Sequence, residues 1–343
     1  MIEALLEYGL FLAKAVTLVA ALIITLSGVV HIVRQAREQL AEQLEVKNLN
    51  ERFRSMAEVL QEHMAGEAGS KDLHKQRKKE RKAEAKAAKK GRKQAKPRLF
   101  VLDFDGDIRA SAVDNLREEI SAVLQVAQDD DEVLLKLESG GGLVHSYGLA
   151  ASQLQRLRDK GVRLVAAIDR VAASGGYMMA GVAGHIIAAP FAVIGSIGVV
   201  AQIPNFNRWL KEHQIDFEMI TAGEHKRTLT LFGENTEAAR EKFRQEIEET
   251  HELFKTFLKD NRPNLDLDSV ATGEHWYGRR ALELGLIDEI KTSDDYLLES
   301  AKTHDIFSVA FKTRRTLSDR LSHAARAFRE PATRREDFLR IQH

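Results

Sequence analysis

The feature that most constrains the fold is an alternation of short apolar runs and helix-patterned segments that begins after Pro97. Residues 113–126 and 149–157 carry apolar side chains at helical spacing. Five apolar runs are predicted to be strands, at 98–104, 133–137, 163–168, 185–189 and 193–200. Because strands that are apolar along their whole length are buried on both faces, the pattern predicts an α/β domain with a largely parallel, helix-covered sheet.

The N-terminus carries an apolar stretch from Tyr8 to Val33. About 20 apolar residues are enough for a helix to cross a bilayer, so residues 1–33 are predicted to be a single transmembrane anchor. A cleaved signal peptide is the alternative, but Glu3 and Glu7 stand where such a peptide has basic residues. Lys and Arg follow the stretch, which favours a cytoplasmic position for the rest of the chain. A periplasmic position stays open, because this rule weakens for long domains.

Residues 34–97 are predicted to form a helical, basic spacer. Apolar residues three to five apart through 34–64 predict an amphipathic helix that packs on a partner or on a second copy. Residues 71–98 hold 14 Lys and Arg against three acids, with no aromatic residue among them. We favour a tether beside anionic lipid headgroups over a nucleic-acid site, and expect no nucleic-acid partner.

The run from Gly175 to Ala201 is also apolar enough to be considered as a second membrane span. Pro190, His185 and five glycines from Gly176 to Gly198 interrupt it, and no charged anchors flank it. Buried strands and a helix of small residues explain the run better, so we predict no second span.

Ser174 ends an apolar run and precedes Gly175, Gly176 and an apolar helix. The N–H groups at a helix start point outward, so the Gly175 amide can stabilise an oxyanion there. A second glycine-rich turn, Ser139–Gly142, also follows a strand. Turns at the ends of adjacent strands converge on the sheet edge where open α/β folds bind ligands. Each turn taken alone is explained better as a tight turn that needs positive φ.

The base that would activate Ser174 is not identified by these patterns. His145, His185, His225 and Lys226 are all candidates, although His185 heads an apolar strand and suits packing or capping better. A free lysine has a pKa near 10.4, so a lysine base needs burial to lose its charge near neutral pH. The chain has no cysteine, which excludes disulfides and thiolate metal sites. We expect neither a metal nor a cofactor.

Several motifs occur together in a fixed order. They are Glu138–Gly142, Ala172–Tyr177, Ile194–Val199, Ala222–Lys226, Tyr277–Ala281 and Gly285–Asp288. In order and spacing the chain resembles the signal peptide peptidase A family, which are membrane-anchored serine–lysine peptidases. The resemblance runs from the anchor to about Ile290. The basic spacer and the Gly148–Leu154 segment narrow it to bacterial inner-membrane members.

The resemblance implies a role for each candidate. Ser174 would be the nucleophile, Lys226 the general base and acid, and the amides of Gly142 and Gly175 the oxyanion hole. Residues 98–312 would form a Clp protease/crotonase-like domain that assembles into rings, in which Ser and Lys can come from neighbouring protomers. The family has Ser-Pro where this chain has Ser139-Gly140, and losing the proline loosens the turn. The basic tail at 313–343 carries no motif.

The combined interpretation is a single-pass inner-membrane serine endopeptidase. Its expected substrates are signal-peptide remnants or unfolded, membrane-derived peptides, and its expected partners are membrane lipid and further copies of itself. Two alternatives stay open. A crotonase-like acyl-CoA enzyme would bind CoA and would not require Ser174, and a catalytically silent, membrane-tethered scaffold would use the glycine turns for structure alone.

Overall fold

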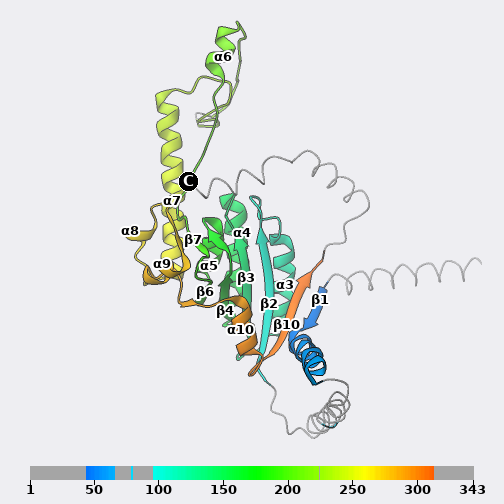
Figure 1. Ribbon diagram of the computed structural model, residues 1–343. Coiled ribbons are helices and arrows are strands. Elements are labelled where there is room, and N and C mark those ends of the chain that lie inside the picture. The colour runs from blue at the N-terminus through cyan, green and yellow to red at the C-terminus, as the bar shows by residue number, and fades with distance from the viewer. Residues whose placement is uncertain (1–43, 66–78, 80–95, 224, 313–343) are drawn as a thin grey trace, which may run out of the picture. The chain divides into compact units, whose positions relative to one another are not determined.

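The computed structural model describes residues 44–65, 79, 96–223 and 225–312 (Figure 1). The predicted anchor, most of the basic tract and the tail lie outside these residues, so their boundaries stay predictions. Within the described part of the chain, no helix is both long and apolar enough to span a bilayer. The chain divides into two compact units, and the account below concerns mainly the one that contains Val46–Ala310.

A single mixed sheet forms the centre of the structure. Its main path has the order β1-β10-β2-β3-β4-β6-β9, while β5 pairs with β3 and β7, and β8 pairs with β7. The strands are β1 (Leu44–Asn48), β2 (Arg98–Gly106), β3 (Glu132–Ser139), β4 (Arg163–Ile168), β5 (Val171–Ala173), β6 (His185–Ala188), β7 (Val193–Gly195), β8 (His275–Tyr277), β9 (Glu289–Ile290) and β10 (Asp305–Phe311). From β10 to β9 the pairings are parallel, and β7 with β8 is antiparallel. The prediction of a largely parallel sheet is confirmed.

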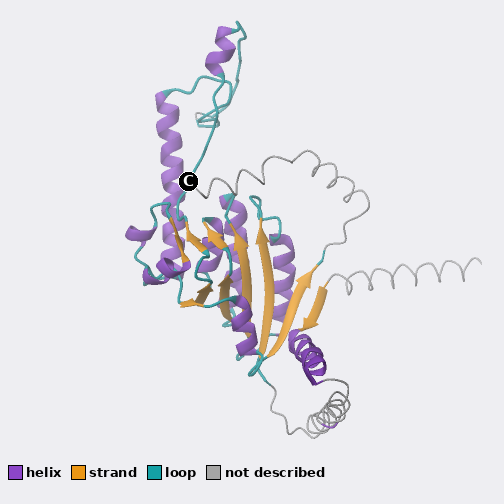
Figure 2. Ribbon diagram, viewed as in Figure 1, coloured by secondary structure: helices purple, strands orange, loops and turns teal. Residues whose placement is uncertain are grey.

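Helices cover both faces of this sheet (Figure 2). The helices that follow β2 along the chain are α3 (Val113–Val126), α4 (Val144–Asp159), α5 (Gly175–Gly181), α6 (Asn207–Glu212), α7 (Glu237–Asn261), α8 (Leu267–Val270), α9 (Gly278–Glu283) and α10 (Ser293–Ser300). Of these, α6 buries no residue and lies away from the sheet (Figure 2). Leu297 of α10 packs on one face with Val101 and Leu134. Alternate residues such as Leu102 and Leu135 face the other side and are also fully buried. Burial on both faces explains why these strands are apolar throughout.

The apolar run 175–201 contains no second span, as predicted. It holds the helix α5 and the strands β6 and β7, with turns between them. All seven residues of α5 are buried, and its glycines allow close packing: Gly175 lies against the Tyr147 side chain, Gly176 against the Ser139 backbone and Gly181 against the Leu258 side chain. The hydrophobicity of this run therefore reflects burial inside the domain and not contact with lipid.

The prediction of one continuous helix over 34–64 is wrong at Leu44–Asn48, which is the strand β1; residues 49–65 are helical. Leu49 is 8% exposed and lies in the same core cluster as Leu297, with Phe53 packed against it. The Asn50 side chain donates to the carbonyls of Ala301 and His304 and accepts from the Ile306 amide. Pairing at the sheet edge thus overrides the helical spacing, because long-range hydrogen bonds outweigh local propensity.

A polar cluster around Asp288 joins α7 to the sheet. The Arg262 guanidinium donates to both carboxylate oxygens of Asp288, at 2.8 and 2.9 Å, and to the Gly285 carbonyl at 3.0 Å. Asp288 also accepts from the Ile186 amide at 2.7 Å. Burial by itself raises the pKa of Asp288, but the hydrogen bonds from Arg262 and Ile186 outweigh it and lower that pKa below its usual value. The Gly285–Asp288 motif is therefore explained by structure.

We predict that Asp288→Asn lowers the free energy of unfolding at pH 7 by about 1.5–3 kcal/mol, because it leaves Arg262 without its charged partner. A carboxylate with a lowered pKa stabilises the fold above its unfolded pKa, about 3.9, and loses that contribution as pH falls through the folded value. The difference between wild type and variant should therefore shrink below about pH 4. Urea unfolding of both proteins at pH 7 and at pH 3.5 measures this difference in the free energy of unfolding.

Glu283→Gln provides the matched control, since Glu283 pairs with Arg280 on the surface, where both side chains are mostly exposed. That pair should contribute less than about 1 kcal/mol at either pH. Equal effects of the two substitutions at pH 7, or a pH-independent effect of Asp288→Asn, would contradict the role given to this cluster.

Candidate active site

Ser174 lies between β5 and α5, and its backbone has a conformation that residues with a side chain rarely adopt. Its φ is 51° and its ψ is −120°. The Ser174 amide donates to the Gly195 carbonyl at 2.8 Å, and the Ser174 carbonyl accepts from the Met178 amide at 3.0 Å. Such backbone geometry costs on the order of 1–3 kcal/mol and persists only where the surroundings enforce it. The surrounding hydrogen bonds hold this partly exposed serine at the start of α5.

The glycine-rich turn after β3 lies directly against Ser174. Ser139 pairs with Ala172 across β3 and β5, which brings the two turns side by side. Gly141 has φ +89°, and a Cβ added to it would lie 2.7 Å from the Ser174 Cβ and 2.8 Å from the Gly175 nitrogen. Only a residue without a side chain allows this approach. The predicted convergence of the two turns is therefore confirmed.

Gly142 and Gly175 both lie beside Ser174. A small cavity is lined by these three residues together with Val144, Met178, Gly198, Val199, Thr250 and Phe254. At Gly142 an added Cβ would lie 2.1 Å from the Ile108 carbonyl oxygen, and at Gly175 it would lie 2.4 Å from the Tyr147 ring. The backbone of Gly142 is thus packed tightly against Ile108, and that of Gly175 against Tyr147. Thr250 and Phe254 come from α7, and nothing in the sequence pattern marked them as site residues.

Lys226 is not among the residues that line this cavity. It is exposed, and its amide donates to the Gly223 carbonyl at 3.2 Å. The segment that carries it is a long excursion between β7 and α7, which also contains α6 (Figure 1). Within one chain, the structure brings together Ser174, Gly142 and Gly175 and does not bring Lys226 to them.

The three candidate histidines also lie outside the cavity. His145 and His225 are exposed. His185 lies 3.3 Å from a Glu289 carboxylate oxygen and 3.9 Å from one of Asp288, so it belongs to the polar cluster around Asp288.

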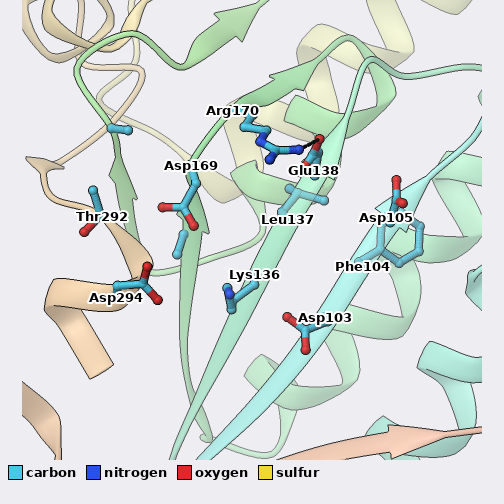
Figure 3. Close-up of a pocket in the computed structure, with 12 residues that line it drawn as sticks. Asp103, Phe104, Asp105, Lys136, Leu137, Glu138, Asp169, Arg170, Thr292 and Asp294 are labelled. Carbon is cyan, nitrogen blue, oxygen red and sulfur yellow. Dashed lines mark hydrogen bonds and ion pairs between the residues drawn. The ribbon is translucent and has the colours of Figure 1, made fainter. Parts of the chain in front are cut away.

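A separate polar groove lies over the sheet face that α10 partly covers (Figure 3). Its charged side chains are Asp103, Asp105, Lys136, Glu138, Asp169, Arg170 and Asp294. Glu138 pairs with Arg170 at 3.2 Å, and Asp169 accepts hydrogen bonds from the Ser293 amide and hydroxyl. None of the predicted catalytic residues lines it. Among the described residues, no group of three or more His, Asp or Glu side chains is arranged to hold a metal ion.

A serine held between a strand and a helix, with glycine amides packed around it, is the arrangement of a serine hydrolase. The chain belongs to peptidase family S49: residues 3–154 match the Peptidase family S49 N-terminal region, and residues 156–306 match Peptidase family S49. It is a serine peptidase, so the acyl-CoA enzyme and the silent scaffold are set aside.

Two sequence relatives agree with this assignment. The chain is 50% identical over 330 residues to "Probable protease SohB" of Haemophilus influenzae, covering 94% of this chain and 93% of the relative. It is 49% identical to "Probable protease SohB" of Buchnera aphidicola subsp. Schlechtendalia chinensis, covering 86% and 99%. A solved structure of the 1510-N membrane-bound stomatin-specific protease, in complex with a substrate peptide, aligns with TM-score 0.37 and 15% identity over 66% of this chain and 97% of that one.

We predict that Gly141→Ala lowers the rate at which a fluorophosphonate probe labels Ser174 by at least about 100-fold, because the new methyl group displaces Ser174 and the Gly175 amide. Labelling of the full-length protein, followed by peptide mapping, measures this rate. Gly140→Ala is the matched control in the same turn, since an added Cβ there meets nothing within 4 Å. Equal labelling of the two variants would contradict the close contact between the turns.

Proposed function

We propose that this chain is a membrane-anchored endopeptidase in which Ser174 attacks the peptide carbonyl and Lys226 transfers the protons. The observation that carries the proposal is the contact between the two glycine turns at Ser174. In the proposed site the amides of Gly142 and Gly175 would donate hydrogen bonds to the carbonyl oxygen. Preorganised donors of this kind supply much of the rate enhancement in acyl transfer.

In the proposed reaction the Ser174 Oγ bonds to the carbonyl carbon while its proton passes to a neutral Lys226 Nζ. The tetrahedral oxyanion accepts hydrogen bonds from the two glycine amides. Collapse breaks the C–N bond, and Lys226 returns the proton to the leaving amine. Lys226 then takes a proton from water, which attacks the acyl-enzyme and releases the product acid and Ser174. The cycle balances with neither metal nor cofactor.

We further propose that Lys226 reaches Ser174 of a neighbouring copy. A lysine base must lose contact with water, whereas Lys226 is exposed in the single chain. The excursion that carries it also exposes large apolar side chains, of which Ile220 is 96% exposed. The others are Val200, Ile203, Phe206, Trp209, Ile215, Phe217, Met219, Leu231 and Phe232. Ten exposed apolar side chains on one segment are typical of an interface, and a head-to-tail ring of copies would cover them.

The substrates we propose are extended, apolar peptides such as signal-peptide remnants or unfolded membrane-protein segments. The cavity beside Ser174 is small and lined by Met178, Val199 and Phe254, which suits a small apolar side chain next to the cleaved bond. Residues 1–33 would hold the enzyme in the bacterial inner membrane, close to such peptides. The flanking charges favour a cytoplasmic catalytic domain, and the basic tract would lie against anionic lipid.

We predict that Ser174→Ala and Lys226→Ala each lower kcat for peptide cleavage by at least about 10³-fold, because each removes one half of the catalytic pair. A mixture of the two inactive proteins, unfolded and refolded together at equal amounts, should recover up to about a quarter of wild-type activity if neighbouring copies share a site. Cleavage of a quenched fluorescent peptide measures both.

Lys211→Ala is the control for loss of a lysine in the same excursion, since Lys211 pairs with Glu234 on the surface, and it should keep full activity. Recovery in the mixture supports a shared site, and its absence with both single variants inactive supports a site within one chain. Full activity of Ser174→Ala would reject the proposed mechanism.

A further inference from the structure

The two side chains that fix the glycine turn are Ser139 and Tyr147, and both are buried inside the domain. Ser139 is 2% exposed and Tyr147 is fully buried. Neither lines the cavity beside Ser174. Three consecutive glycines, Gly140–Gly142, give the turn more backbone freedom than any other residues would, so an outside constraint is needed to hold its amides in one orientation.

The hydrogen bonds form a single directed chain. The Tyr147 hydroxyl donates its only proton to the Asp107 carbonyl at 2.7 Å. In the 2.5 Å contact between the two hydroxyls, Ser139 is therefore the donor and Tyr147 the acceptor. Ser139 in turn accepts from the Gly141 amide at 3.1 Å, while the Gly106 carbonyl lies farther from its Oγ, at 3.3 Å. Each proton is used once, and successive bonds in such a chain strengthen one another.

The Tyr147 ring supports the second turn. A Cβ added to Gly175 would lie 2.4 Å from the ring Cγ, so the ring lies directly on the Gly175 backbone. Phe104 packs edge-on against the same ring, with centroids 6.5 Å apart. Burial raises the pKa of Tyr147, which keeps its hydroxyl neutral and able to donate. One side chain therefore contacts both turns, through its ring and through Ser139.

We infer that Ser139 and Tyr147 are a positioning pair, which holds the Gly141–Gly142 backbone in the orientation that stabilises the oxyanion at Ser174. Neither residue touches the substrate. The inference rests on the proposed function, because it assigns the pair to the oxyanion hole of that mechanism. It also explains how a turn with three glycines keeps a fixed geometry.

Tyr147→Phe tests the pair, since it removes the hydroxyl and keeps the ring on Gly175. We expect kcat for peptide cleavage to fall about 10- to 100-fold while KM changes less than about two-fold, because the oxyanion contact is made in the transition state. Ser139→Ala should do the same. The double variant should be no worse than the more impaired single variant, since both changes break one chain of hydrogen bonds.

Tyr177→Phe is the matched control. Tyr177 is also fully buried, and its hydroxyl donates to the Leu286 carbonyl at 2.8 Å, away from the turn. We expect it to lower the unfolding midpoint about as much as Tyr147→Phe does while kcat stays within about two-fold of wild type. A merely structural role for Tyr147 would give the two variants the same kcat.

Equal kcat in Tyr147→Phe and Tyr177→Phe overturns the inference, as does full kcat in Ser139→Ala. If Tyr147→Phe does not fold, the kcat of Ser139→Ala alone decides whether the inference holds. The proposed function is tested separately by Ser174→Ala: activity in that variant rejects the mechanism itself. Loss of activity in Ser174→Ala combined with unchanged kcat in Ser139→Ala rejects only the positioning pair.

Discussion

One strand pairing places the whole site. β3 runs parallel to β4 from Glu132 to Lys136, and its last residue, Ser139, then pairs with Ala172 of β5. Between β4 and β5 the chain leaves one branch of the sheet and starts another, which continues into β7 and β8. Because of this branch, the turn after β3 and the turn after β5 are in contact with each other. The backbone contact at Ser174 follows from it directly.

That contact requires backbone without side chains on one side and a strained serine on the other. Gly141 approaches Ser174 so closely that any Cβ would clash, and Gly175 lies flat on the Tyr147 ring. Ser174 itself is held at φ 51°. The rigid parallel sheet and the buried helix α5 offset the cost of this geometry, because buried elements resist relaxation. The strained backbone of Ser174 is thus supported by the core behind it.

The proposed base, Lys226, lies in a different part of the structure from Ser174. Ser174 and its glycine turns are built on the sheet, whereas Lys226 lies on an exposed excursion with a large apolar surface. A nucleophile and oxyanion hole need rigid positioning, and a neutral lysine needs exclusion of water. Dividing the two between the core of one copy and the excursion of another would make the active site depend on assembly. Such an enzyme would be inactive as an isolated chain.

The sequence by itself determined the parallel α/β sheet and the bounds of α3, because burial on both faces imposes continuous apolar strands and a helix imposes its own spacing. It also marked Ser174 and both glycine turns, since Gly and Ser at strand ends are visible locally. The sequence pattern predicted a helix where the structure has the edge strand β1. It also gave no sign of the hydrogen bond between Ser139 and Tyr147, or that Thr250 and Phe254 line the cavity beside Ser174. Only the tertiary structure decided these, because they depend on contacts between residues that the local pattern does not relate. For the same reason it alone showed that Lys226 stands apart from Ser174 within one chain.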